Sequence, residues 1–190
     1  MTAPQLPETP LKNPTPRRIS WAIPVAFILL IGFLVLLGIS LSRTQSGRPD
    51  IGDRAPEFTL TTFAGDSIRS TDLVGQVVLL NFWASWCLPC AEEAAALEQV
   101  WRDYQPGGQV MFIGVDYVDT EPEARAYLQD YNVTYPNGPD LGTRISRAYR
   151  ITGVPETYLI DASGIIRGYK LGPFTSVAEI QQFVAGALTP

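Results

Sequence analysis

One continuous run of mostly apolar residues, Val77–Trp83, passes almost directly into a segment with helical periodicity. The run is rich in β-branched and aromatic residues, which is typical of a strand that is buried on both faces. From Pro89 to Tyr104 the apolar residues recur at helical spacing, and Gly107-Gly108 ends that segment. Because a strand buried on both faces needs helices to cover it, the chain is predicted to be an α/β protein.

The rest of the domain continues this alternation. Strands are expected in four further segments, at 58–60, 110–115, 157–160 and 165–169. Helices are expected in three further segments, at 122–131, 141–149 and 177–188. The turn sequence Asp161-Ala162-Ser163-Gly164 predicts that the last two strands form a hairpin. The order of elements predicts a mixed sheet with helices on both faces.

Two cysteines, Cys87 and Cys90, lie between the predicted central strand and its helix. Pro89 suits the first helical turn, because its missing N–H would have no partner there. The free N–H groups at this helix end carry partial positive charge, which stabilises a thiolate, the reactive form of the thiol. We therefore predict that Cys87 is the more exposed, attacking thiol and that Cys90 resolves a mixed disulfide from one turn further in.

Two alternatives to a redox role for the cysteine pair are a permanent structural disulfide and a zinc site. A permanent disulfide between them would close a loop of only four residues, which restricts the unfolded chain by roughly 2 kcal/mol, against about 4.7 kcal/mol for a loop of about 100 residues. A zinc site needs four ligands, and the chain has no histidine and only two cysteines, so such a site would have to be shared between two copies. A redox-active disulfide is the favoured interpretation, and neither a metal nor a separate cofactor is expected.

A second apolar run, Ile19–Ser42, contains no charged residue. As a helix with a rise of about 1.5 Å per residue, its segment 19–41 would extend roughly 34 Å, enough for a bilayer core of about 30 Å. We therefore predict an uncleaved, single-pass transmembrane anchor at 19–41. A cleaved signal peptide is the alternative, but its apolar region is usually about 7–15 residues long and ends in a small-x-small cleavage site, which this run lacks.

The segments around the predicted anchor complete the organisation of the chain. Residues 1–18 contain five prolines and are predicted to be a disordered cytoplasmic tail, and the polar residues 42–50 are predicted to be a linker before a domain at 51–190. Three basic residues precede the apolar run and two follow it, which favours a cytoplasmic N-terminus. We expect the C-terminal domain to lie on the extracytoplasmic side of the plasma membrane.

The predicted domain is acidic. Residues 51–190 contain nine Lys and Arg against 17 Asp and Glu, which gives a net charge of −8. Nucleic-acid binding depends on cations that meet phosphates, so this composition argues against a nucleic-acid partner. The domain is expected to be a monomer.

Two positions near the cysteine pair have ordinary explanations as well as functional ones. Trp86 is either a core-packing residue or a flat apolar wall beside the sulfur on which a partner docks. Val154-Pro155 lies just before a predicted strand, and on its own it is explained by a plain strand-entry proline, since few X–Pro bonds are cis. The residues alone leave both alternatives open.

The combined motifs resemble a known family. The segment Phe82–Cys90, which reads Phe-Trp-Ala-Ser-Trp-Cys-Leu-Pro-Cys, resembles the active site of thioredoxin. Segments 52–58, 75–81 and 153–161 are similar to the membrane-anchored cytochrome c maturation branch of the thioredoxin-like thiol:disulfide oxidoreductases. The resemblance covers about residues 51–188 and implies a thioredoxin-like fold, with a mixed central sheet and helices on both faces.

The resemblance also implies roles for individual residues. Pro155 matches the family's cis-proline, which faces the cysteines and pairs with the substrate backbone. Glu93, three residues after Cys90, matches a glutamate near the disulfide; if Glu93 faces inward, burial would raise its pKa and let it handle a thiol proton. Glu156 matches an acidic residue beside the cis-proline. Each glutamate has an ordinary alternative, as a solvated charge on the helix or at the strand end. Asn81 departs from ordinary thioredoxin, which has a buried aspartate there, so Glu93 would be the substitute acid.

The function implied by the resemblance is the reduction of disulfides outside the cytoplasm. The expected substrate is a disulfide in an exported protein, above all apocytochrome c, and the electrons would come from a membrane thiol-electron transporter. A general exported disulfide reductase or oxidase with other partners is one alternative, and a tethered binding domain with an inert cysteine pair is another. A thiol peroxidase is disfavoured, because its Pro-x-x-x-Thr/Ser-x-x-Cys loop would require other residues at Leu80 and Ala84.

Overall fold

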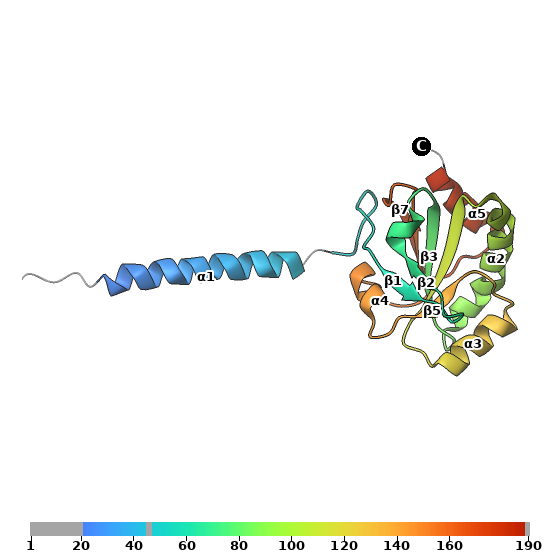
Figure 1. Cartoon of the computed structure of the whole chain (residues 1–190), viewed down its shortest axis with the longest axis horizontal. Coiled ribbons are helices and arrows are strands. Elements are labelled where there is room, and N and C mark those ends of the chain that lie inside the picture. Colours follow the sequence, from blue (N-terminus) through green and yellow to red (C-terminus); the bar gives the residue numbers. More distant parts are fainter. Residues whose placement is uncertain (1–20, 45–46, 189–190) are drawn as a thin grey trace, which may run out of the picture. The chain divides into compact units, whose positions relative to one another are not determined.

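The computed structural model describes residues 21–44 and 47–188, and the chain divides into two units, 1–46 and 47–190 (Figure 1). The first unit contains the helix α1 (Ala22–Thr44), whose side chains from Pro24 to Leu37 are exposed. No helix in the described part of the chain combines the length and the apolar character needed to cross a membrane, so the transmembrane prediction for 19–41 is not confirmed. The predicted tail at 1–18 lies outside the described residues.

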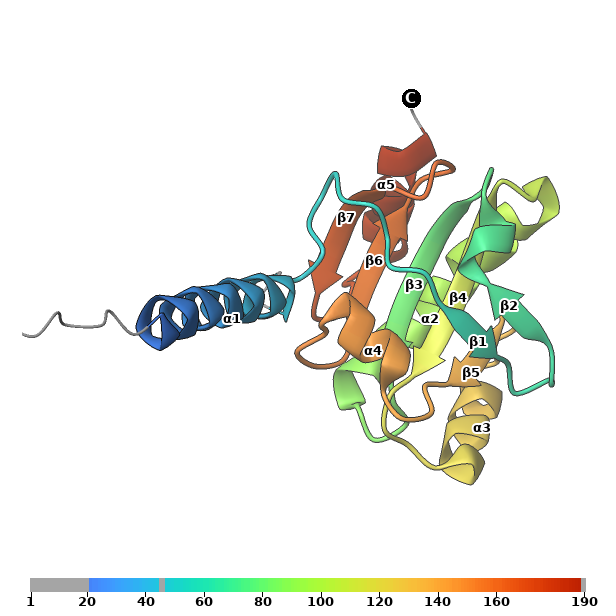
Figure 2. The ribbon, with the colours of Figure 1, turned by 60° about the vertical axis from the view of Figure 1, so that its left-hand side comes forward.

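The second unit is built around a five-stranded sheet with the strand order β5-β4-β3-β6-β7 (Figure 2). Its strands are β3 (Val77–Trp83), β4 (Val110–Asp116), β5 (Asn137–Pro139), β6 (Glu156–Ile160) and β7 (Ile166–Leu171). The central strand β3 pairs in parallel with β4 and antiparallel with β6. β5 adds in parallel to β4, and β7 adds antiparallel to β6 as the predicted hairpin. The predicted mixed sheet is therefore confirmed.

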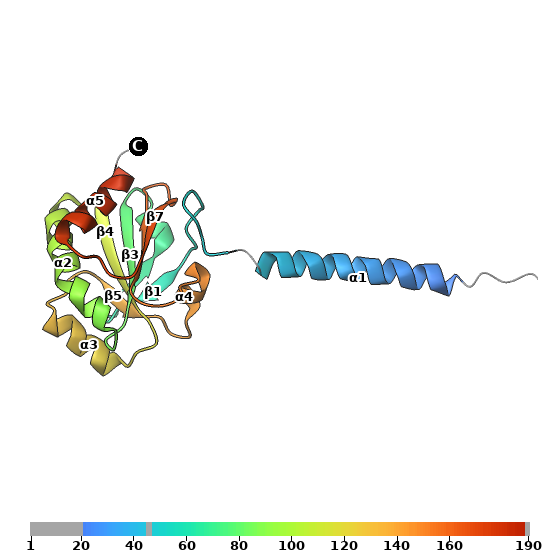
Figure 3. The ribbon, with the colours of Figure 1, turned by 180° about the vertical axis from the view of Figure 1, so that it is seen from behind.

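Alternation along β3 divides its side chains between the two faces of the sheet, and all seven of its residues are buried. Val77 and Leu79 pack in one cluster with α2 (Leu88–Tyr104) and α5 (Val177–Leu188), which lie together on one face (Figure 3). Val78, Leu80 and Phe82 pack in a second cluster with β1 (Thr59–Thr61) and α4 (Arg144–Tyr149) on the other face. The predicted strand buried on both faces is thus confirmed.

Two short strands were not predicted from the sequence. β2 (Ser67–Arg69) pairs only with β1, and the three residues of β5 are asparagine, glycine and proline, which are typical of turns. Glycine is required at the centre of β5, because a Cβ on Gly138 would lie 2.3 Å from the backbone oxygen of Thr61. Close packing of two backbones therefore determines a strand that local sequence preference opposes.

The helices agree with the prediction except near α4. α3 spans Glu121–Asp130, one residue away from the predicted bounds at each end. α4 has only six residues, whereas the sequence predicted a helix from 141. Gly142 and Thr143 both have positive φ, so the helix cannot begin before them. The Asp140 carboxylate accepts hydrogen bonds from the backbone N–H groups of Ile145 (3.0 Å) and Ser146 (2.8 Å), which satisfies the start of the shortened helix.

Candidate active site

Cys87 and Cys90 form a disulfide at the N-terminal end of α2, as the sequence predicted. Cys87 is the N-cap residue with an extended backbone, and Pro89 lies in the first helical turn. The backbone N–H of Cys90 donates to Cys87 Sγ at 3.2 Å. In the reduced form, this N–H and the positive end of the helix would stabilise a thiolate on Cys87.

The exposure of the pair differs from the prediction. Cys87 is 4% exposed and Cys90 is 1% exposed, so the predicted order holds, but both residues are buried in the disulfide form. Their neighbours are the exposed residues: Trp86 is 60% exposed, and Leu88 is exposed as well. The Trp86 indole N–H donates to the backbone oxygen of Val118 at 3.1 Å, which fixes the ring at the surface. Trp86 is therefore an exposed apolar wall beside the disulfide and not a core residue.

Glu93 is the inward-facing member of the Glu92-Glu93 pair, with 1% exposure, whereas Glu92 is exposed. One oxygen of Glu93 accepts from Asn81 Nδ2 at 3.0 Å, and the other accepts from the backbone N–H of Phe174 at 2.8 Å. Burial outweighs these hydrogen bonds and raises the pKa of Glu93 to about 7. A carboxyl group with this pKa, one helical turn after Cys90, can accept or release a proton near neutral pH.

The Val154–Pro155 peptide bond is cis, which confirms the expectation drawn from the resemblance. Pro155 is buried, and Val154 packs against the cluster that contains both cysteines. The backbone oxygen of Pro155 accepts from the N–H of Gly172 at 3.0 Å. The segment that carries Pro155 therefore lies beside the disulfide, although the two are far apart in the sequence.

Glu156 is 2% exposed, so it is not a solvated charge at the end of a strand. Its carboxylate forms an ion pair with Arg48 at 2.9 Å and accepts hydrogen bonds from the backbone N–H of Thr152 and the hydroxyl of Tyr158. Burial raises the pKa of Glu156, and the attraction of Arg48 opposes this shift. Arg48 lies in the segment predicted as a linker, yet its side chain belongs to the second unit.

Sequence reasoning also missed the segment after β4, which holds the loop before Cys87. The Asp119 carboxylate accepts from the backbone N–H of Ser85 at 2.6 Å and from its hydroxyl at 2.9 Å. Asp116 is nearby and buried, and burial together with the charge of Asp119 raises the pKa of Asp116 to about 8. The available signal was two carboxylates directly after a buried strand, where the ends of the parallel strands β3 and β4 meet.

An aromatic stack supports the disulfide from behind. Trp83 and Tyr127 have ring centroids 4.4 Å apart at an interplanar angle of 20°. The Tyr127 hydroxyl donates to the backbone oxygen of Cys90 at 2.8 Å, and the Trp83 indole N–H donates to Asn137 Oδ1 at 2.8 Å. These contacts tie the first turn of α2 to α3 and to the edge of the sheet.

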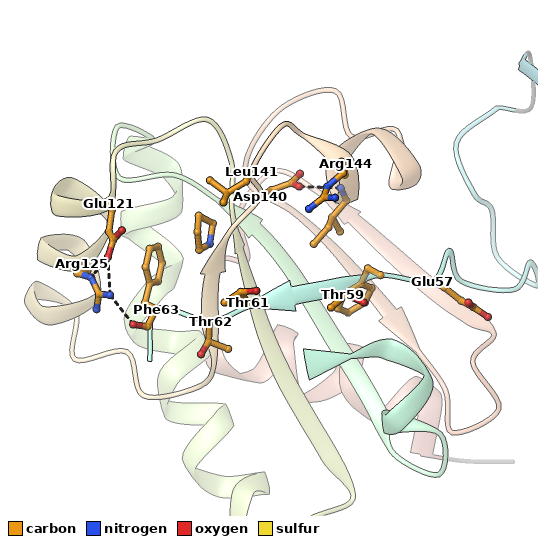
Figure 4. A pocket seen from close by; sticks show the side chains of 13 residues that line it. Glu57, Thr59, Thr61, Thr62, Phe63, Glu121, Arg125, Asp140, Leu141 and Arg144 are labelled. Carbon is orange, nitrogen blue, oxygen red and sulfur yellow. Dashed lines mark hydrogen bonds and ion pairs between the residues drawn. The ribbon is translucent and has the colours of Figure 1, made fainter. Parts of the chain in front are cut away.

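A pocket of about 440 Å³ lies elsewhere, between β1, β5 and the starts of α3 and α4 (Figure 4). Arg125 lies in its wall, where it pairs with Glu121 at 2.8 Å and donates to the backbone oxygen of Phe63 at 2.6 Å. None of the predicted site residues lines this pocket. Within residues 21–44 and 47–188, no group of three or more potential protein ligands could hold a metal ion.

Comparison with known proteins points to one family. A sequence profile of the AhpC/TSA family matches residues 51–169. The thiol:disulfide interchange protein DsbE of Allochromatium vinosum is 36% identical over 171 residues, which cover 86% of this chain and 91% of that protein. The thiol-disulfide oxidoreductase ResA of Bacillus cereus is 32% identical over 134 residues, which cover 70% and 75%. A thiol:disulfide interchange protein of the thioredoxin family from Chlorobium tepidum has a similar structure, with a TM-score of 0.66 and 31% identity over 75% of this chain and 99% of that one.

Proposed function

Since the chain belongs to the AhpC/TSA family as a thioredoxin-like thiol:disulfide oxidoreductase, we propose that its cysteine pair reduces disulfides in exported proteins. The observation that carries this proposal is the Cys87–Cys90 disulfide at the start of α2, with the Cys90 N–H directed at Cys87 Sγ. This arrangement makes Cys87 the favoured thiolate of the reduced pair.

Reduction of a substrate runs in two exchange steps. The Cys87 thiolate attacks one sulfur of the substrate disulfide, so that a mixed disulfide forms and the other substrate sulfur leaves as a thiolate, which takes up a proton. The Cys90 thiol then loses its proton and attacks Cys87 Sγ. This second step restores the Cys87–Cys90 disulfide and releases the second substrate thiol.

The surrounding residues have complementary roles in these steps. Glu93 is the candidate acceptor of the Cys90 proton, because burial brings its pKa to about 7. Trp86 offers the exposed apolar surface on which a substrate can lie next to Cys87. The Val154–Pro155 segment, which precedes Glu156, is the proposed contact for the backbone of the substrate chain. The disulfide is the redox group, and no other cofactor is needed.

The proposed substrate is apocytochrome c, whose Cys-x-x-Cys-His sequence must be reduced before haem attachment, and the proposed electron donor is a membrane thiol-electron transporter. The similarity to the cytochrome c maturation branch supports both. We propose that the domain is a monomer outside the cytoplasm, attached to the plasma membrane through residues 19–41. The absence of charged residues from 19 to 42 and the exposed apolar side chains of α1 support this attachment. A C-terminal reporter that is active only outside the cytoplasm tests the location, and an inactive fusion would contradict it.

Trapping in cells tests the exchange mechanism. A Cys90→Ala variant should accumulate a mixed disulfide between Cys87 and its substrate, because the resolving thiol is missing. Cys87→Ala is the matched control and should trap nothing under the same conditions. Identification of the captured protein by mass spectrometry then tests the apocytochrome c assignment. If Cys87 reacts with iodoacetamide but captures no protein, the exchange proposal is wrong.

The reduction potential decides between a reductant and an oxidant. A reductase should have a potential near that of thioredoxin, about −270 mV, whereas strong oxidants of the same motif lie near −120 mV. Equilibration of the purified chain with glutathione buffers measures this value. Rapid consumption of hydrogen peroxide by the reduced chain would instead favour the thiol peroxidase alternative.

A further inference from the structure

Arg48 makes four contacts with residues near the end of the sheet where Pro155 lies. Its guanidinium contacts both carboxylate oxygens of Glu156, at 2.9 Å and 3.1 Å, and donates to the Thr152 hydroxyl at 3.2 Å. The same group lies over the ring of Tyr169, 5.4 Å from its centroid. The Arg48 side chain is 19% exposed and that of Glu156 is 3% exposed, so the ion pair is largely removed from water.

Arg48 contacts residues on both sides of Pro155 in the sequence. Thr152 lies three residues before Pro155, and Glu156 follows it directly. The backbone N–H of Thr152 also donates to the Glu156 carboxylate, which therefore links the two ends of the segment 152–156. With Arg48 in place, Glu156 is held by groups from the N-terminal segment, from the loop before β6 and from β6 itself.

We infer that Arg48 is a positioning residue for the proposed substrate contact at Pro155, which acts by holding Glu156 and Thr152 and thereby the backbone of the segment between them. This inference rests on the proposed function, because it assigns to Pro155 a contact with substrate backbone. None of these contacts of Arg48 involves a cysteine, so Arg48 would act through the segment from Thr152 to Glu156. A guanidinium suits this role, because its planar fork can contact two carboxylate oxygens and a hydroxyl at once.

If the inference is correct, substitution of Arg48 should slow the reduction of peptide disulfides but not the reduction of small disulfides. A peptide disulfide would need the proposed backbone contact at Pro155, whereas a small disulfide needs only access to Cys87. The test compares the reduced full-length chain, in detergent, against a synthetic peptide with an intramolecular Cys-x-x-Cys disulfide and against hydroxyethyl disulfide. Arg48→Gln should slow the peptide reaction by about tenfold, as expected for loss of a hydrogen-bonded charge, and should change the small-disulfide rate by less than about twofold.

Three further variants sharpen this test. Arg167→Gln is the matched control, because Arg167 pairs with Asp161 just beyond the other end of β6 at 2.6 Å; it should leave both rates unchanged. Arg48→Lys keeps the charge without the fork and should give an intermediate peptide rate, and it also serves if Arg48→Gln does not fold. Arg48→Gln combined with Glu156→Gln should be no slower with the peptide than the slower of the two single variants.

The outcomes distinguish this inference from the proposed function. If Arg48→Gln and Arg48→Lys react with the peptide as fast as Arg167→Gln does, the inference is overturned while the exchange function stands. Equal slowing with both disulfides would also overturn it, because Arg48 would then act on the cysteines or on folding in general. If the unmodified chain reacts with neither disulfide, the proposed function itself fails.

Discussion

Glu93 should contribute a pH dependence to the stability of the disulfide-bonded domain between pH 4.5 and about 7, and glutamine in its place should remove that contribution. The carboxyl is 1% exposed, and burial is the largest cause of its raised pKa. Hydrogen bonds from the Phe174 N–H and from Asn81 oppose the shift without cancelling it. The unfolded chain has no such burial, so its glutamate titrates near the ordinary value of 4.5.

The sign and size of the effect follow from these two pKa values. Between pH 4.5 and about 7, the unfolded chain has lost this proton while the folded chain still holds it, so the free energy of unfolding falls as the pH rises. At about 1.4 kcal/mol for each pKa unit, the shift from 4.5 to about 7 corresponds to roughly 3 kcal/mol. Outside this window both states carry the same charge at Glu93, and its contribution is constant.

Urea unfolding between pH 4 and pH 8, followed by tryptophan fluorescence, measures this loss. The disulfide form is used because disulfide-bonded cysteines do not titrate. The free energy of unfolding of Glu93→Gln, relative to the unmodified chain, should rise with pH by roughly 3 kcal/mol. Glu92→Gln, on the exposed neighbour, should follow the unmodified chain. Parallel curves for Glu93→Gln and the unmodified chain would refute the reasoning, since all other titrating groups are shared.

Two other substitutions test the packing and the electrostatics around the site. Gly114→Ala should lower the free energy of unfolding by about 3 kcal/mol in urea titrations, because the added Cβ would lie 1.6 Å from Asn137 Oδ1; an unchanged midpoint would contradict the close packing of β4 on β5. Asp119→Asn should lower the pKa of Asp116 from about 8, because it removes a neighbouring negative charge. Carboxyl carbon-13 NMR measures that value, and an unchanged titration would show that the two aspartates are not coupled.

The parts of the fold that were predicted from sequence have strong local signals. The apolar run of β3 and the periodicity of α2 each lie within one short segment, so the strand–helix junction and the position of Cys87 followed directly. β5 could not be predicted, because Asn137, Gly138 and Pro139 are turn residues whose pairing depends on β4 and β1. A close approach between distant segments leaves no local pattern.

The residues of the candidate site divide in the same way, into those with a local sequence signal and those whose contacts depend on distant segments. Helical periodicity places Glu93 on the apolar face, four and eight residues before Leu97 and Trp101, and Glu92 about 100° away from it. What periodicity could not supply is the pair of hydrogen-bond donors to the buried Glu93 carboxylate, Asn81 and the Phe174 N–H, because both come from other elements. The partner of Glu156 is 108 positions away at Arg48, in a polar stretch that composition assigns to a linker. The resemblance to the family predicted Pro155 and Glu156, whereas the hydrogen bonds that hold them from Gly172 and Arg48 join residues distant in the sequence and have no local sequence signal.

The antiparallel pairing of β3 with β6, which sets Phe82 opposite Glu156, has a consequence for the order in which the site is assembled. The reactive sulfurs lie in the first half of the domain, and the segment proposed to hold the substrate lies in the second half. At about 5–20 residues per second of synthesis, Cys90 leaves the ribosome several seconds before Pro155. During that interval a nascent chain carries both thiols without the segment proposed to contact the substrate. A chain that stops after α4 would therefore carry both cysteines but lack Pro155 and the strand β6 that pairs with β3.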